Sequence, residues 1–170
     1  MTWLGKMLKW SMASTDNSIT EIALKMPQDE KVEDTEKEEV LLWATPKQAW
    51  HSVRVLCDNE GLSVSEKNLI CAVIYQESGF KNTAICRNKD KQGNITSSDW
   101  GICQVNDYWH CGKGKTFPSA EYVVAHPEEA VRWMLKMYRL GLLKLWVGYS
   151  SGAYQKWLSP TSKMWLLKGV

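Results

Sequence analysis

Residues 63–80 read SVSEKNLICAVIYQESGF and carry the most complete local signal in the chain. Ser63 and Glu66 form a capping-box pattern, in which each side chain accepts a hydrogen bond from the other residue's backbone amide. Apolar residues then recur at helical spacing, at positions 69, 70, 73 and 74. Gly79 is typical of the residue that ends a helix. The stretch therefore predicts a helix between Ser63 and Gly79 with one apolar face.

Glu77 lies on this apolar face, in the last turn of the predicted helix. Apolar neighbours and the negative end of a helix dipole both disfavour an ionised carboxylate, so its pKa is expected to be raised. A carboxylic acid that keeps its proton near neutral pH can protonate a glycosidic oxygen. The alternative is a glutamate that extends into solvent at the helix end and has no role.

Two further segments have helical patterns, whereas the polar segment between them has the pattern of a hairpin. A helix is expected to begin at Pro46, and another is expected from Pro127 to Arg139, with Gly141 just after it. Residues 88–104 are rich in Asn, Gly, Ser and Thr, which favours a loop with short hairpin strands. The chain is therefore expected to be mostly α, with a small β element.

Composition divides the chain at about residue 40. Residues 1–40 are expected to be an N-terminal tail and acidic linker, and residues 41–170 the folded domain. Residues 1–26 could form an amphipathic helix that contacts a membrane or a protein, or they could be a frayed tail. Lys6 and Lys9 interrupt the first apolar residues, so no standard signal peptide is expected. No segment approaches the ~18 apolar residues that span a bilayer.

Charge and cysteine content exclude several classes of function. The net charge is +2, from 21 basic and 19 acidic side chains, which is too mild for a nucleic-acid-binding face. No pair among the five cysteines has Cys-x-x-Cys spacing, so a zinc site is not expected. The cysteines are expected to be small buried residues, with one disulfide left open. Neither a metal nor another cofactor is predicted.

A calcium-binding loop is an alternative interpretation of the polar segment. Asn88, Asp90, Gln92, Gly93 and Asp99 fall at positions one, three, five, six and twelve of that pattern. Positions one and five are neutral, and the last position has Asp where Glu is usual, so affinity for calcium would be poor. A polar hairpin loop is the better interpretation.

Three sequence elements in fixed order resemble the lysozyme-like superfamily. The first is Glu77-Ser78-Gly79-Phe80, and the second is Asp99-Trp100-Gly101-Ile102-Cys103-Gln104-Val105-Asn106. C-type lysozymes have Glu-Ser-x-Phe followed by Asp-Tyr-Gly-Ile-x-Gln-Ile-Asn. Lytic transglycosylases of the SLT type have Glu-Ser-x-Phe followed by Gly-Leu-x-Gln-Ile-Asn. The third element, Tyr149-Ser150-Ser151-Gly152, resembles the transglycosylase Tyr-Asn-x-Gly motif, and the resemblance covers about residues 66–158.

The resemblance implies a lysozyme-like fold with a small β-hairpin beside an active-site cleft. It implies that Glu77 is the general acid and base, that Asp99 is the second carboxylate, and that Tyr149 hydrogen-bonds near the acid. An alternative for Asp99 is a residue that only holds the hairpin. The residues expected to contact sugar are Ser78, Trp100, Gln104 and Asn106. Trp109 could also stack on a sugar, and for both Trp100 and Trp109 the alternative is a place in the core.

Departures from the family pattern, including the lack of an evident C-type disulfide framework, favour the transglycosylase branch for the fold and leave the product, hydrolytic or 1,6-anhydro, undecided. Glu77 and Asp99 are 22 residues apart, which is longer than in C-type enzymes, and Ser150 replaces the usual Asn. The resemblance implies a monomeric muramidase that cuts the β-1,4 bond between N-acetylmuramic acid and N-acetylglucosamine. It would act at the cell wall, in the periplasm or outside the cell, and would be phage-encoded or delivered by an apparatus. The alternative is an inactive wall-binding or structural module of a phage particle or secretion apparatus.

Overall fold

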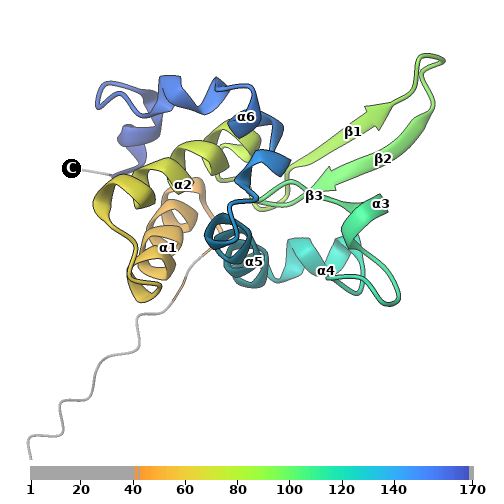
Figure 1. The fold of residues 1–170 in the computed structure, drawn as a ribbon, viewed down its shortest axis with the longest axis horizontal. Coiled ribbons are helices and arrows are strands. Elements are labelled where there is room, and N and C mark those ends of the chain that lie inside the picture. The colour runs from red at the N-terminus through yellow and green to blue at the C-terminus, as the bar shows by residue number, and fades with distance from the viewer. Residues whose placement is uncertain (1–40, 42, 169–170) are drawn as a thin grey trace, which may run out of the picture. The chain divides into compact units, whose positions relative to one another are not determined.

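A computed structural model describes residues 41 and 43–168, and its helices are arranged around one small sheet (Figure 1). The predictions for residues 1–40 lie outside the described residues. The helices and strands are α1 (Pro46–Asn59), α2 (Val64–Ser78), β1 (Ile85–Lys89), β2 (Ile95–Trp100), β3 (Val105–Asn106), α3 (Asp107–His110), α4 (Ala120–Ala125), α5 (Pro127–Arg139), η1 (Leu143–Leu145), α6 (Val147–Ser150), η2 (Ala153–Trp157) and η3 (Lys163–Lys168), where η marks a 3₁₀-helix. The predicted fold class, mostly α with a small β element, is confirmed, and it is consistent with a lysozyme-like fold.

The ends of α2 follow from its sequence. Ser63 is the N-cap, and its side chain and that of Glu66 make the reciprocal capping-box contacts. Gly79 follows the last turn with φ of 62°, a left-handed conformation that glycine adopts without steric cost. Both ends of the predicted helix are therefore confirmed. They fix how far α2 runs, and hence where Glu77 lies.

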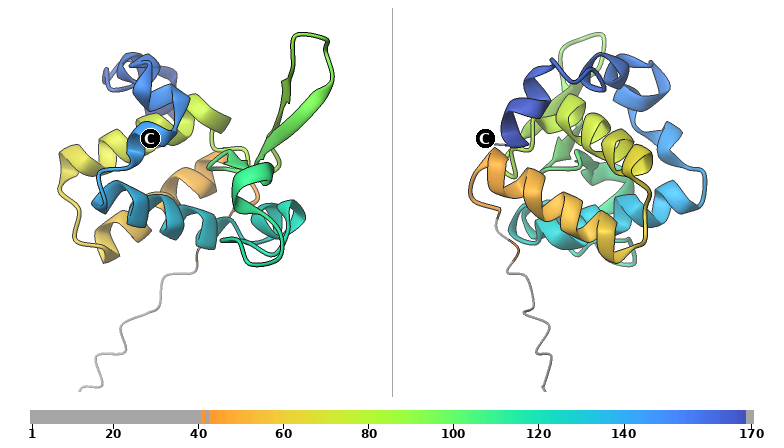
Figure 2. Two further views of the ribbon diagram at one scale, coloured as in Figure 1. Left: turned by 45° about the vertical axis from the view of Figure 1, so that its right-hand side comes forward. Right: turned by 90° about the vertical axis from the view of Figure 1, so that its left-hand side faces the viewer.

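The small sheet is antiparallel, with strand order β1-β2-β3. Cys86 pairs with Asp99 and Asn88 with Ser97, and the register shifts between Asn88 and Lys89. The hairpin begins at residue 85, three residues before the predicted polar segment. Figures 1 and 2 show β1 and β2 projecting as a two-stranded arm beyond the helices. The sheet is anchored at the end of β2, where β3 pairs with Asp99 and Trp100.

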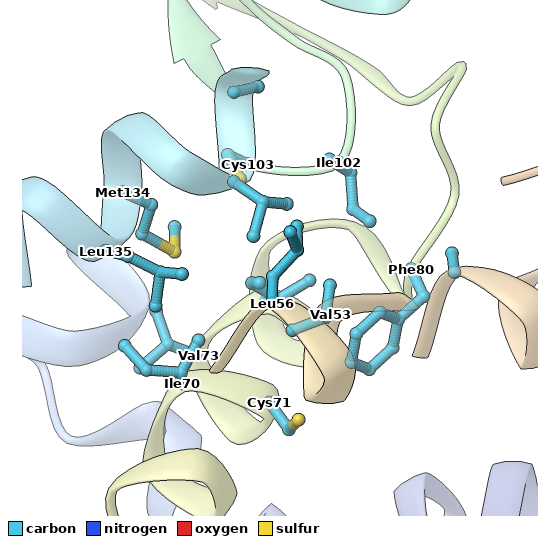
Figure 3. Packing of buried hydrophobic residues seen from close by; sticks show 14 of the residues in the cluster. Val53, Leu56, Ile70, Cys71, Val73, Phe80, Ile102, Cys103, Met134 and Leu135 are labelled. Carbon is cyan, nitrogen blue, oxygen red and sulfur yellow. The ribbon is translucent and has the colours of Figure 1, made fainter. Parts of the chain in front are cut away.

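The hydrophobic core lies among α1, α2, α5 and the turn that follows β2 (Figure 3). Helix α2 contributes Ile70 and Val73, α1 contributes Leu56, and α5 contributes Met134, all fully buried. Ile102, in the turn between β2 and β3, is buried beside them. The core therefore attaches the base of the hairpin to the helix that carries Glu77. Among the described residues, no helix is long and apolar enough to cross a membrane.

Candidate active site

Glu77 lies in the last turn of α2 and is partly buried. Burial raises the pKa of its carboxyl above the ordinary value, and the charge of Asp99 raises it further. The backbone N–H of Gly148 donates a 2.8 Å hydrogen bond to Oε1, and this hydrogen bond lowers the pKa. The predicted direction of the pKa is thus confirmed, with burial as its main cause. Within residues 43–168, no group donates a hydrogen bond to Oε2, the second carboxyl oxygen.

Gly148 brings the backbone of α6 against the acid. A β-carbon at this position would lie 2.5 Å from Oε1 of Glu77 and 2.7 Å from Cγ of Gln76, closer than side-chain carbons approach other atoms. Gly148 is the single described glycine whose φ is not positive, so backbone strain does not require glycine there. Glycine is required there by lack of space, because the absence of a side chain lets the Gly148 amide reach the carboxyl group.

Asp99 lies on β2 and is held by two amide side chains. Its Oδ1 accepts a hydrogen bond of 2.7 Å from Asn106, and its Oδ2 accepts one of 3.0 Å from Asn88. Both amides also donate to the hydroxyl of Ser97, each over 3.1 Å. The second carboxylate is therefore fixed in orientation by the sheet. Sequence reasoning missed Asn88 and Ser97 in this role, although period-two alternation places them on one hairpin face with Asp99.

One cavity of about 590 Å³ brings the two carboxyl groups together. Its volume falls within the range of ~300–1,000 Å³ that is usual for ligand sites. The sheet supplies one wall, and the segment from η1 to α6 supplies another. The lining residues are Glu77, Asn88, Asp99, Gln104, Val105, Asn106, Trp109, His110, Trp133, Leu145, Trp146 and Val147. We call this cavity the cleft.

Gln104 and Asn106 line the cleft, where the resemblance puts them. The Gln104 side-chain amide donates to the carbonyls of Ala84 and Gly101, so it also closes the turn after β2. Asn106 accepts a hydrogen bond from the amide of Trp109 and caps the short helix α3. Both side chains are therefore fixed by the fold as well as facing the cavity.

Three other predicted site residues make contacts within the fold and do not line the cleft. The Ser78 hydroxyl donates to the Ile102 carbonyl over 2.7 Å, and the Trp100 indole N–H donates to Asp107 over 3.1 Å. The ring of Tyr149 stacks on that of Tyr154, with centroids 5.2 Å apart. In the described part of the chain, the recorded partner of Glu77 is the Gly148 amide and not the Tyr149 hydroxyl. Substrate contacts by these three residues stay predictions.

An aromatic group lies at the rim of the cleft. Trp109 is 69% exposed, so it is a surface residue, and the core alternative for it is wrong. His110 and Trp133 line the cleft behind it, with ring centroids 4.8 Å apart. Burial lowers the pKa of His110 below the ordinary value, and the charge of Lys115 lowers it further. No sequence motif marks His110 as a residue of the cleft.

The polar segment forms the predicted hairpin. Asp90 stands in the turn between β1 and β2, where its carboxylate accepts hydrogen bonds from the amides of Gln92 and Asn94. The residues of the calcium-loop pattern are thus spread over two paired strands and their turn. In the described part of the chain, no group of three His, Cys, Asp or Glu side chains could hold a metal ion.

All five cysteines are free thiols. Cys57, Cys71 and Cys103 are buried, whereas Cys86 is exposed and Cys111 is partly exposed. Desolvation raises the pKa of Cys71 to about 12, so this thiol stays protonated and unreactive. The expectation of small buried residues therefore holds for three of the five.

Comparisons with known proteins give partial similarities. Lysozyme C-1 of Anas platyrhynchos is 47% identical over 49 residues, 29% of this chain and 29% of that protein. Protein IpgF of Shigella flexneri is 30% identical over 102 residues, 59% of this chain and 64% of that protein. A peptidoglycan-binding-like protein of Escherichia coli O157:H7 is 46% identical over 41 residues, 24% of this chain and 25% of that protein.

The chain spans less than two thirds of each of these relatives. No family model matches the sequence, and no solved structure matches it. The chain is therefore similar in part to lysozymes and to a peptidoglycan-binding-like protein, and its architecture is consistent with a lysozyme-like fold.

Proposed function

We propose that this domain cleaves the β-1,4 bond between N-acetylmuramic acid and N-acetylglucosamine in peptidoglycan, with Glu77 as the general acid. The observation that carries the proposal is the pairing of Glu77 and Asp99 across one cleft. Burial favours the protonated form of Glu77, and Asp99 is held by two amides. Two carboxyl groups in different environments suit glycoside cleavage, because one can donate the proton while the other stabilises positive charge on the sugar.

In the first step, the Glu77 proton passes to the glycosidic oxygen as the bond to the anomeric carbon breaks. The Gly148 amide holds Oε1, which leaves Oε2 to carry the proton toward the sugar. Positive charge develops on the sugar ring, and the Asp99 carboxylate in the same cleft stabilises it. Glu77 is then ionised, and the hydrogen bond from Gly148 stabilises that charge.

In the second step, Glu77 takes a proton from the group that attacks the anomeric carbon. If the attacking group is water, the product is a reducing sugar. If it is the 6-hydroxyl of the same muramyl residue, the product is a 1,6-anhydro sugar, which is one water lighter. We favour the anhydro product, because this route needs no water in the cleft and requires only the acid and base function of Glu77.

Trp109 is proposed to stack on a sugar ring, because its exposed indole borders the cleft. Gln104 and Asn106 are proposed to hydrogen-bond the glycan from the sheet side, and Tyr149 to stabilise the acid. The monomeric state, and delivery to the wall by a phage or a secretion apparatus, stay proposals of the same kind.

Digestion of purified sacculi, followed by mass spectrometry of the soluble products, tests this proposal. Wild-type protein is expected to release disaccharide muropeptides, and their masses distinguish the anhydro from the reducing product. Glu77→Gln is expected to lose activity by about a thousandfold, because the amide is not acidic enough to transfer a proton to the glycosidic oxygen. Asn59→Asp, on the exposed end of α1, is a matched control for a single amide–acid exchange.

Two outcomes contradict the proposed mechanism. Cleavage that survives Glu77→Gln would remove Glu77 from the reaction. Wild-type protein that binds sacculi but releases no product would favour a wall-binding module.

A further inference from the structure

A second hollow, of about 450 Å³, lies along β2 and shares no lining residue with the cleft. We call it the β2 hollow. Strand β2 forms one side of it, and α3, the following loop and the start of α4 form the other. Its lining residues are Ile95, Thr96, Ser97, Ser98, Asp107, Tyr108, Cys111, Gly112, Pro118, Ser119 and Ala120.

Two cations of β1 border this hollow through the strand register. Arg87 pairs with Ser98 and Lys89 pairs with Ile95, and both of these partners line the hollow. Directly paired residues of antiparallel strands point to the same face of the sheet, so each cation lies beside a lining residue. Both side chains are exposed, and the described residues show no ion pair for either.

Two more cations lie on the opposite border. Lys113 and Lys115 are exposed in the loop between the lining residues Gly112 and Pro118. The Lys115 ammonium lies 5.4 Å from the centre of the Tyr108 ring and donates a hydrogen bond to the Tyr108 carbonyl. The hollow is therefore bordered by basic side chains on both sides.

Acidic side chains offset this charge only in part. Asp107 lines the hollow, but its two oxygens accept hydrogen bonds from the Ser98 amide and the Trp100 indole. Glu121, on α4, is exposed next to the lining residue Ala120. Four cations against these two acids leave an excess of positive charge, so a carboxylate would be attracted.

The surface between the cations is partly apolar. Ile95 is 56% exposed and Tyr108 is 60% exposed, and both line the hollow. Hydroxyl groups of Thr96 and Ser119 stand among them. Exposed apolar side chains beside hydroxyls and cations fit a ligand with small apolar groups, amides and carboxylates. An acidic peptide has this chemistry, whereas a free phosphate has no apolar part.

We infer that the β2 hollow binds the carboxylate-bearing peptide stems that branch from a peptidoglycan strand held in the cleft. This inference rests on the proposed function. A stem of about four residues extends ~13 Å, and neighbouring strands lie ~5 Å apart, so a stem is longer than a pair of strands is wide. Strand β1 is the free edge of the sheet, so a stem can pass round it. The hollow would then favour substituted glycan over bare glycan.

Binding of a free stem tetrapeptide, without sugar, to the full chain tests the inference directly. Amide chemical shifts in labelled protein are expected to change in a saturable way at Ile95, Thr96 and Tyr108. The affinity is expected to fall as salt is raised, because exposed charges are screened. Inorganic phosphate at the same ionic strength is the comparison for a simple anion.

Charge reversal supplies the matched variants. Arg87→Glu with Lys89→Glu is expected to weaken tetrapeptide binding by about tenfold. The control is Lys47→Glu with Lys136→Glu, which changes net charge equally at two exposed helix positions away from the hollow. The control is expected to bind the peptide as wild type does. On sacculi, the first pair is expected to raise KM and leave kcat unchanged.

Three results would overturn the inference. The first is that the tetrapeptide changes amide shifts only at cleft residues such as Trp109. The second is that both double variants weaken tetrapeptide binding equally, and the third is that inorganic phosphate produces the same shift changes as the tetrapeptide. Because the tetrapeptide contains no glycosidic bond, its binding does not depend on cleavage. Loss of peptide binding with intact cleavage would therefore refute this inference alone, and absent cleavage with intact peptide binding would refute the enzymatic proposal alone.

Discussion

Replacing Gly148 with alanine should disable the acid while Glu77 itself is left unsubstituted. The added methyl group would lie 2.5 Å from Oε1 and 3.3 Å from Cδ of Glu77, so the carboxyl group must move. The hydrogen bond from the Gly148 amide, now 2.8 Å, is then lost or lengthened. The change adds one carbon, introduces no charge, and falls where φ is in the ordinary negative region.

Crowding by the added methyl group is expected to lower stability, and displacement of the acid is expected to lower the rate. Overpacking a buried site costs about 1–3 kcal/mol of stability. A shift of the acid by about 1 Å costs roughly a hundredfold in rate. Loss of the Gly148 hydrogen bond by itself would raise the pKa of Glu77. Burial is the larger effect, however, so a carboxyl pushed toward solvent should have a lower pKa. The high-pH limb of the rate profile should then move to lower pH, since Glu77 must be protonated to act.

Three measurements on one preparation test this reasoning: kcat against pH on solubilised glycan, KM, and urea denaturation. We expect kcat to fall by about a hundredfold with little change in KM, because the sugar contacts of the sheet are intact. Ser150→Ala, on the exposed side of the same short helix, is the control and should resemble wild type. A Gly148→Ala protein with unchanged kcat and an unchanged pH profile would refute the placement of Glu77 against α6.

Three further predictions concern stability and binding. Glu77→Gln should unfold at a higher urea concentration than wild type near neutral pH, but not in acid. The reason is that the wild-type folded state loses stability as pH rises from the ordinary carboxyl pKa through the raised pKa of Glu77. Equal gains in stability at both pH values would contradict this. Asp107→Ala should cost about 2–3 kcal/mol by thermal denaturation, since the amide of Ser98 and the indole of Trp100 lose their acceptor. Trp109→Ala should weaken glycan binding about fivefold in titration calorimetry, with a nearly unchanged melting temperature.

The elements that sequence predicts well are those defined by neighbours along the chain. The capping box at Ser63, the glycine at position 79 and the helix that begins at Pro127 all appear where the sequence predicts them. Their causes are local, because a cap or a turn is satisfied within about four residues. The direction of the Glu77 pKa was predictable in part for the same reason, because the apolar spacing and the helix end are both local features.

The parts of the site that sequence reasoning missed depend on contacts between distant segments. Gly148 lies 71 residues from Glu77, and nothing in its local pattern marks a backbone amide as the partner of a carboxyl group. Asn88 reaches Asp99 only through the hairpin register, which a bulge shifts. The contact of the Ser78 hydroxyl with the Ile102 carbonyl likewise joins distant segments, and the substrate contact expected of Ser78 stays a prediction.

The burial of Glu77, and with it the raised pKa of its carboxyl group, depends on the segment from η1 to η2. This segment lies against α2, where Trp157 donates to Gln76 and Gly148 donates to Glu77. A second contact, from the buried Trp146 indole to the Cys103 carbonyl over 2.7 Å, ties the same segment to the turn between β2 and β3. Removing this segment would expose Glu77 to solvent and let its pKa fall toward the ordinary value. A chain that has folded only through α5 therefore has both carboxyl groups but lacks the burial that makes one of them an acid.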